Sequence, residues 1–241
     1  MKIYSLLHRG DYHPTCCEDF LLTETVEDQF FVAAVMDGCS NGKESHFAST
    51  LMAKIIRKAC KIAPHTAKLS LQNTAAQTLG KWILRQLFID LNNVRETLFL
   101  ERTELLATLI LLVYQHKSQE AFIISLGDGV IAIDGEIQSI DQQNMPDYIS
   151  YHLSKDFEEW YARQKHVYQV TAPKSISIST DGIESFMTKT HEYAPVDVPR
   201  YLLHDLTFAE HKNMLGKKTQ VLYAEHNISP KDDLGIVRLN F

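Results

Sequence analysis

The chain has 241 residues, with 24 Lys and Arg against 30 Asp and Glu, a formal net charge of −6, and 45% hydrophobic residues. A chain of this length is expected to bury about 70% of its unfolded surface, which provides a core without structural staples. The acidic balance and the lack of a basic run argue against a nucleic-acid backbone or an anionic membrane surface as the main partner.

The sequence shows no sign of export or membrane insertion. The apolar stretch within MKIYSLLHRGDYH is too short and too soon interrupted by charge for a secretory signal. The longest apolar runs, at 30–36 and 105–114, have roughly half the length that crosses a bilayer. The four cysteines form no CxxC pair, so we expect reduced thiols in a cytoplasmic protein.

Strands and helices are predicted in separate blocks. Alternating or β-branched runs bounded by turn residues predict strands at 3–7, 19–23, 30–36, 106–114, 121–126, 130–133, 136–140, 175–179 and 234–239. Asp134 and Gly135 predict a tight hairpin turn, because a type I′ turn needs positive φ at both positions. Apolar residues at helical spacing predict long helices over 46–62 and 71–100, and more helix precedes the last strand.

This order predicts an α+β fold rather than alternating βαβ units. No linker or repeat divides the chain, so we expect one domain over residues 1–241. The stretch 141–174 is the least regular and is rich in polar and aromatic residues, which indicates a flap or surface insertion. Its aromatic residues either pack the flap onto the domain or form a lip that binds a peptide.

Acidic residues recur where the predicted strands begin or end. Asp37, Asp128 and Asp181 each follow a strand and precede a glycine, whose missing Cβ lets backbone approach a ligand closely. Glu18 and Asp19 open another strand, as do Asp232 and Asp233 at the last one. Each site alone is ordinary turn chemistry. Together, carboxylates at one sheet edge would repel one another unless cations lay between them, and such a set suits Mg²⁺ or Mn²⁺.

The same residues lie in a series of motifs that follow one another in a specific order. These are CCEDF, FFVAAVMDGCSNGKESHFAST, ATLILLVY with FIISLGDGVIAIDGEI, SISISTDGIES and KDDLGIVRL. The series resembles the dispersed motifs of the metal-dependent protein phosphatase 2C family over nearly the whole chain. The resemblance implies a four-layer αββα sandwich, in which two antiparallel β-sheets are flanked by helices.

The resemblance also implies a metal centre. Asp37 would bridge two divalent ions, Mn²⁺ or Mg²⁺, with the carbonyl of Gly38 completing one coordination sphere, while Asp181 and Asp232 hold the other ion. Catalysis would then run through these three carboxylates, with a metal-bridging water or hydroxide attacking phosphorus in line.

The resemblance implies that three further acidic residues support the metal centre. Glu18 and Asp19 would act mostly through metal-bound waters, and Asp128 matches the residue that helps hold a third, weaker ion in many relatives.

Two positions depart from the family pattern. Many relatives have an arginine four residues before the acidic pair, where it grips the substrate phosphate, and this position is Pro14. Arg9 and His13 are the nearest candidates for substrate binding, although neither is in register. Cys39 stands where eukaryotic relatives often have a histidine, which indicates a bacterial-type enzyme.

The expected function is therefore hydrolysis of phosphoserine or phosphothreonine in cytoplasmic proteins. The substrate would be a phosphoprotein, and the enzyme would oppose a Ser/Thr kinase. The alternative is a catalytically weak phosphatase-like regulatory domain that binds a phosphoprotein partner. The retained Asp37, Asp181 and Asp232 favour the enzyme, whereas Pro14 and the loop CSNGKES favour the regulator. The sequence gives no indication of the oligomeric state.

Overall fold

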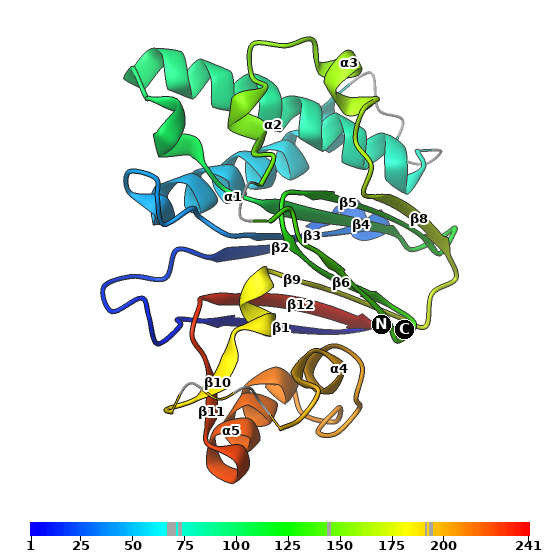
Figure 1. The fold of residues 1–241 in the computed structure, drawn as a ribbon. Helices are drawn as coiled ribbons and strands as arrows, with labels where there is room; N and C mark the ends of the chain where they lie inside the picture. Colours follow the sequence, from blue (N-terminus) through cyan, green and yellow to red (C-terminus); the bar gives the residue numbers. More distant parts are fainter. Residues whose placement is uncertain (67–70, 72–73, 144–145, 191, 193–194) are drawn as a thin grey trace.

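The computed structural model of the chain describes residues 1–66, 71, 74–143, 146–190, 192 and 195–241. Within these residues, two five-stranded antiparallel sheets lie face to face, and helices cover their outer faces (Figure 1). One sheet has the order β2-β3-β4-β5-β8, the other the order β1-β12-β9-β6-β7, and β10 pairs with β11 outside both. The four-layer αββα sandwich and the antiparallel sheets expected from the sequence are confirmed.

The elements have the following bounds. The strands are β1 (Lys2–His8), β2 (Phe20–Val26), β3 (Phe30–Met36), β4 (Leu109–Gln115), β5 (Glu120–Leu126), β6 (Gly129–Ile133), β7 (Glu136–Ile140), β8 (Val167–Thr171), β9 (Ser175–Ser179), β10 (Phe186–Thr188), β11 (Ile228–Pro230) and β12 (Leu234–Asn240). The α-helices are α1 (Ser45–Ile62), α2 (Ala76–Leu98), α3 (Phe157–Tyr161), α4 (Val198–Leu203) and α5 (Met214–His226). Short 3₁₀ turns include η4 (Arg102–Leu105), η5 (Ile149–Tyr151) and η6 (Asp181–Glu184).

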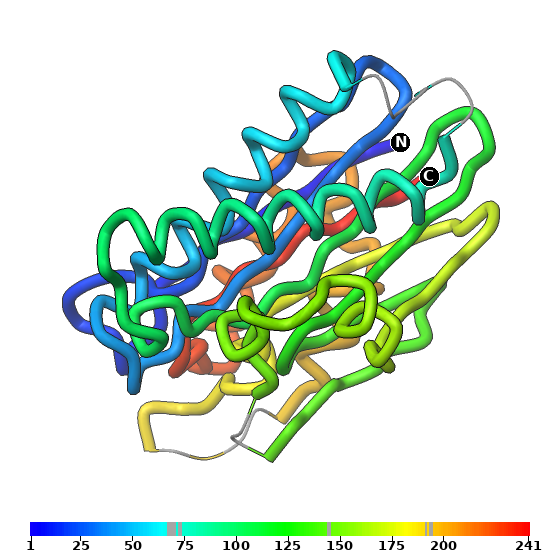
Figure 2. The backbone as a smooth tube through the Cα atoms, turned by 90° about the horizontal axis from the view of Figure 1, so that it is seen from above, coloured from blue at the N-terminus to red at the C-terminus, as the bar shows by residue number. Residues whose placement is uncertain are grey.

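Three apolar layers hold the sandwich together. The first lies between the helices α1 and α2 and the sheet that contains β3, the second between the two sheets, and the third between the other sheet and the helices α4 and α5. Strand β3, FFVAAVM, is buried at all seven positions because it has a sheet on one face and helices on the other. Figure 2 shows α1 and α2 crossing over the strands from above. A strand buried on both faces needs a continuous apolar run, which is what residues 30–36 have.

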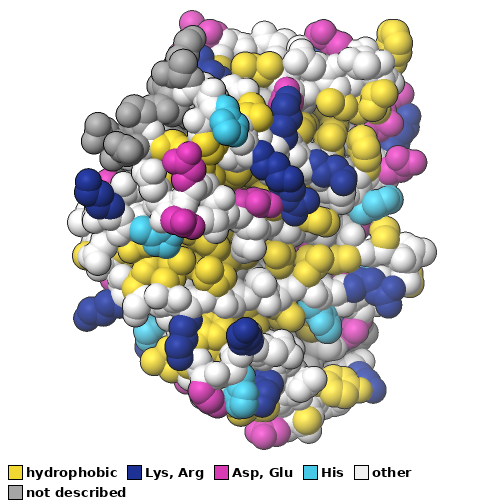
Figure 3. Space-filling model, turned by 180° about the vertical axis from the view of Figure 1, so that it is seen from behind, with side chains coloured by type: hydrophobic (Ala, Val, Ile, Leu, Met, Phe, Trp, Pro, Cys, Tyr) yellow, Lys and Arg dark blue, Asp and Glu magenta, His cyan; other side chains and the backbone are white. Residues whose placement is uncertain are grey.

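The outer surface carries charges of both signs. Seen from behind, Lys and Arg side chains are interspersed with Asp and Glu and with apolar patches (Figure 3). No helix in the described part of the chain is both long and apolar enough to span a membrane. The four cysteines are free thiols, as expected.

Several element predictions match the structure closely. The strands over 30–36, 136–140 and 175–179 have the predicted bounds, and the turn between β6 and β7 has φ values of 51° at Asp134 and 90° at Gly135. The helix predicted over 71–100 begins later, at Ala76, with Leu71 in a short turn; residues 72–73 lie outside the described residues.

The stretch 141–174 is more regular than expected. It contains η5, α3 and strand β8, which pairs with β5 and extends the sheet; residues 144–145 lie outside the described residues. Its aromatic residues pack on α2: the rings of Phe157 and Trp160 lie 5.7 and 5.4 Å from that of Phe88. Both side chains are buried, so this part of the cluster fastens the segment to the domain rather than forming an open lip.

Candidate metal centre

Carboxylates from four parts of the chain meet at one end of the two sheets. Asp37 directly follows β3, Asp181 opens η6 after β9, Asp19 precedes β2, and Asp232 lies two residues before β12. These strands belong to both sheets, so the site straddles the interface between them. Antiparallel pairing of β2 with β3 and of β12 with β9 brings the four ends together.

Asp19 is the most deeply buried of these acids, at 2% exposure. Its Oδ2 accepts a hydrogen bond of 2.6 Å from the hydroxyl of Thr180, and that hydroxyl in turn accepts the backbone N–H of Gly235 at 2.9 Å. Burial raises the pKa of Asp19 well above its ordinary value, and the nearby charge of Asp37 raises it further. Thr180, directly after β9, therefore fixes the orientation of Asp19 and is itself held by Gly235 of β12.

Asp37 and Asp181 have raised pKa values for the same two reasons. Burial raises the pKa of Asp37 most, followed by repulsion from Asp181 and Asp232. Burial and the charge of Asp232 raise the pKa of Asp181 to about 6. Thr108 holds the backbone of Asp37, accepting its N–H at 3.2 Å and donating to its carbonyl at 2.8 Å. The carboxylates thus repel one another in a poorly solvated place, which a bound cation would relieve.

Two glycines beside these acids are required by close backbone packing. A Cβ at Gly38 would overlap the carbonyl of Ser45, and the Gly38 N–H donates to the carbonyl of Glu18 at 3.2 Å. A Cβ at Gly182 would overlap the carbonyl of Asp233. At both positions the missing Cβ allows another backbone segment to approach closely; the expected approach of this backbone to a ligand stays a prediction.

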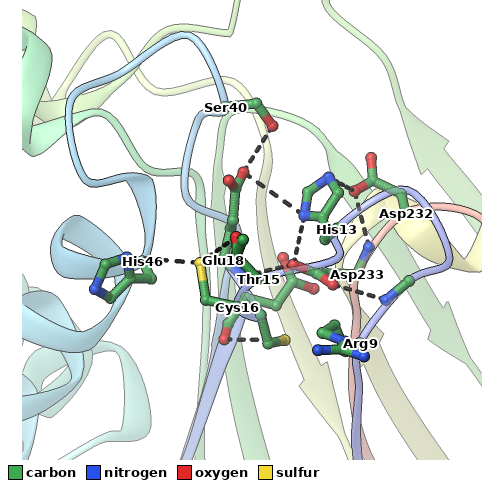
Figure 4. Close-up of polar contacts among 12 residues, drawn as sticks. Arg9, His13, Thr15, Cys16, Glu18, Ser40, His46, Asp232 and Asp233 are labelled. Atoms are coloured by element: carbon green, nitrogen blue, oxygen red, sulfur yellow. Dashed lines mark hydrogen bonds and ion pairs between the residues drawn. The ribbon is translucent and has the colours of Figure 1, made fainter.

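Glu18 lies on the rim of the cluster. Its Oε2 accepts a hydrogen bond of 2.6 Å from Ser40, in the loop after β3 (Figure 4). Its backbone carbonyl accepts one of 2.6 Å from the hydroxyl of Ser49 on α1. The side chain is 16% exposed. The loop and the helix therefore hold Glu18 at the mouth of the site.

Asp233 has a role that the sequence did not reveal. Its carboxylate is 1% exposed and accepts from the N–H of Gly10 at 2.7 Å, the N–H of Glu18 at 2.5 Å and the ring of His13 at 2.7 Å. It ties the chain before β2 to the chain before β12. The doubled aspartate was the only signal, because the donors lie more than 200 residues away along the chain.

The two residues expected to bind substrate lie in different surroundings. His13 lies between acids, with Nδ1 bonded to Asp233 and Nε2 3.3 Å from Asp232. Arg9 is exposed and donates to the carbonyl of Pro14 at 3.1 Å. Figure 4 shows His13 among the carboxylates. The structure therefore places His13 in the cluster. The guanidinium of Arg9 instead bonds to the backbone of the loop that follows β1.

Asp128 lies at the side of the cluster, in the turn between β5 and β6. Its Oδ1 accepts the backbone N–H of Gln142 at 2.7 Å. Burial raises its pKa, and its charge is among those that raise the pKa of Asp181. The position is compatible with a peripheral ligand.

The donor set fits a hard divalent ion. Carboxylate and carbonyl oxygens are the ligands that Mg²⁺ and Mn²⁺ prefer. Burial first, and then the neighbouring carboxylates, raise the pKa values of Asp19, Asp37 and Asp181. As the side chains stand, no three His, Cys, Asp or Glu residues in the described part of the chain form a finished metal cage. Small rotations of the carboxylates would thus accompany ion binding.

The family model for protein phosphatase 2C matches residues 9–218 of the chain. The chain belongs to the protein phosphatase 2C family. This confirms the resemblance seen in the motifs.

Solved structures share the phosphatase 2C fold at low sequence identity. A bacterial serine phosphatase is 12% identical, with a TM-score of 0.63 over 99% of this chain and 96% of that one. RsbX in complex with magnesium is 16% identical, with a TM-score of 0.52 over 98% and 94%. A fragment of SpoIIE from Bacillus subtilis is 13% identical, with a TM-score of 0.60 over 99% of this chain; the chain spans 62% of that fragment. No curated protein matches the chain.

Proposed function

We propose that this phosphatase 2C chain hydrolyses phosphoserine or phosphothreonine in proteins and that it needs two divalent ions, Mn²⁺ or Mg²⁺. The observation that carries the proposal is the convergence of four carboxylates, from Asp19, Asp37, Asp181 and Asp232, at one end of the sheets. Burial raises the pKa of each of them, and the charges of neighbouring carboxylates raise it further. A solved relative of the same fold was crystallised with magnesium.

The residues have distinct roles in this proposal. Asp37, Asp181, Asp232 and the carbonyl of Gly38 hold the ions, and Asp128 contributes to a third, weaker one. When bound, such ions supply an activated water and neutralise the oxygens of the phosphoryl group.

The remaining cluster residues support this arrangement. Glu18 and Asp19 accept hydrogen bonds from coordinated waters, and Ser40 and Thr180 orient them. His13, held by Asp232 and Asp233, is the proposed proton donor to the leaving serine oxygen.

The substrates proposed are phosphoproteins made by a Ser/Thr kinase that the phosphatase opposes, in the cytoplasm. This follows the family assignment and the fold shared with a bacterial serine phosphatase.

A regulatory phosphatase-like domain is the second candidate. The observation that favours it is the missing phosphate-binding arginine, whose position is Pro14. Arg9 does not take its place, because its exposed guanidinium is bonded to the carbonyl of Pro14. A related fold occurs in a protein of the bacterial stressosome. The test below separates the two candidates.

The test compares turnover of p-nitrophenyl phosphate and of a phosphoserine peptide by the wild type, Asp37→Asn and Asp28→Asn, with Mn²⁺ and with EDTA. Asp28 is exposed at the far end of β3 and serves as the matched control. We expect Asp37→Asn to lose about 100-fold or more in kcat/KM, because even outer-shell changes at metal sites cost about 10- to 100-fold. Asp28→Asn should behave as the wild type, and EDTA should stop turnover.

A wild type that hydrolyses neither substrate with Mn²⁺, yet binds a phosphopeptide, would favour the regulatory domain. A rate that survives in EDTA or in Asp37→Asn would defeat the metal assignment.

A further inference from the structure

A cavity of about 570 Å³ lies between residues 142–166 and the end of β5. Its volume is in the range of binding pockets for small groups and side chains. Its floor is the end of β5 with Gly127, and its walls come from the segment that carries α3. None of the roles proposed for the metal centre uses this cavity.

The cavity is basic, although the chain is acidic. Lys155, Arg163 and Lys165 line it, against Asp147 and Glu159. The arithmetic is 3 − 2 = +1 for the charged lining residues, in a chain of net charge −6. Such a local excess of positive charge attracts anions.

Two of these cations lack a carboxylate partner. Arg163 and Lys165 are exposed, and neither forms an ion pair within the part of the chain that the structure describes. Lys155 donates to Nδ1 of His152 at 2.8 Å, and Nε2 of that ring bonds to Asp147 at 2.5 Å. Asp147 is thus already engaged, which leaves the guanidinium of Arg163 and the ammonium of Lys165 available to an incoming anion.

A buried donor lies in the same wall. Trp160 lines the cavity and is 4% exposed, and its indole N–H has no acceptor among the described residues. The ring is held in place by Phe88 and Phe157. Because that nitrogen is itself buried, Trp160 serves the cavity as a fixed aromatic wall.

The cavity adjoins the metal centre. Gly127 immediately precedes Asp128, and Gln142, which also lines the cavity, donates its N–H to Asp128 Oδ1 at 2.7 Å. The Gln142 side chain accepts the N–H of Asp147 at 2.6 Å. A group bound in the cavity would therefore lie on the Asp128 side of the carboxylate cluster.

We propose that this cavity is an anion-binding subsite for a second acidic group of the substrate, a carboxylate or a second phosphoryl group near the phosphoserine that is hydrolysed. Arg163 and Lys165 bind the anion through charge-assisted hydrogen bonds, and the wall formed by Trp160 and its neighbours fixes the cavity. The inference rests on the proposed function, because it names the substrate class of the same site.

The test uses three phosphoserine peptides that differ only in their flanking residues: neutral, Glu-rich, or with a second phosphoserine. The wild type is compared with Arg163→Gln/Lys165→Gln and with Lys61→Gln/Lys117→Gln, a control that removes two exposed charges elsewhere. For the wild type and the control we expect kcat/KM to be about tenfold higher on the anionic peptides than on the neutral one. The first double variant should treat all three peptides alike. A preference for one anionic peptide over the other identifies which acidic group the subsite takes.

A binding measurement separates this inference from the proposed function. Fluorescence anisotropy with phosphonate analogues of the same peptides, which cannot be hydrolysed, reports the preference without turnover. The preference should weaken as salt is added. Absence of hydrolysis together with a retained binding preference would defeat the proposed function and leave the subsite standing. Equal affinity for neutral and anionic analogues in the wild type, or an unchanged preference in Arg163→Gln/Lys165→Gln, would overturn the subsite.

Discussion

At the scale of single residues, the site is a set of acids held where their charges oppose one another. Asp19 is buried and Asp37 is partly buried, and both lie near Asp181. Their raised pKa values follow first from desolvation and then from repulsion by neighbouring carboxylates. Asp233 differs, because donors from Gly10, Glu18 and His13 surround it. Asp233 thus connects separate backbone segments through hydrogen bonds. The other aspartates carry negative charges that a bound cation would balance.

The raised pKa values predict how stability depends on pH. A carboxyl group whose pKa is higher in the folded state binds protons better there, so the protein loses stability as pH rises from the unfolded value of about 3.9 through the folded one, about 6 for Asp181. Between about pH 5 and about pH 7.5 in EDTA, the melting temperature should therefore fall. Added Mn²⁺ should raise it more at the higher pH, because the ions bind ionised carboxylates.

Thermal melts of the wild type and of Asp37→Asn at both pH values measure this effect. Asp11 and Asp205, whose pKa values are lowered by Lys231 and Lys218 among other groups, stay ionised over this range and do not interfere. Asp37→Asn should show a smaller fall. A melting temperature in EDTA that stays level or rises with pH would contradict the assignment of the raised pKa values.

At the scale of elements, close packing explains a residue type inside a helix that helix propensity alone would disfavour. Gly80 lies inside α2, where alanine is normally preferred by about 1 kcal/mol. A Cβ at this position would overlap the ring of Phe122 on β5, and both residues belong to the core between helix and sheet. Gly80 therefore lets α2 lie directly on the strand.

We expect Gly80→Ala to destabilise the protein by about 1–3 kcal/mol, the usual cost of overpacking a core, despite the gain in helix propensity. Gly216→Ala in α5 is the matched control, because its Cβ would meet only the side chain of Asn213, which can move. Urea denaturation of both variants measures the difference. A Gly80→Ala variant as stable as Gly216→Ala would show that α2 does not press on β5 as described.

Element by element, prediction from the sequence succeeded where the signal is local. Residues 30–36 and 175–179 carry their strand signal in their own apolar or β-branched pattern, and the hairpin at Asp134 and Gly135 carries its turn signal in two residues. Strand β8 was missed because VYQVT follows an irregular segment and is fixed by pairing with β5. The acids of the cluster were found from their places at strand ends, whereas the bonds of Asp233 depend on contacts that no local pattern encodes.

At the scale of the whole molecule, the acidic excess becomes a property of one end of the sandwich. The net charge of −6 is formal and spread over 241 residues, but Asp19, Asp37, Asp181 and Asp232 meet where the two sheets meet. Beside them lies a cavity lined by Lys155, Arg163 and Lys165. We therefore propose that this end of the sandwich holds a cation-binding centre and an anion-binding subsite, as a substrate with two acidic groups would require.

An anomalous difference map from a crystal soaked in Mn²⁺ would locate the metal ions. We expect two strong peaks among Asp37, Asp181, Asp232 and the carbonyl of Gly38, with Asp37 contacting both ions. A map with no peak among these residues, or with Mn²⁺ bound only elsewhere on the surface, would contradict this expectation.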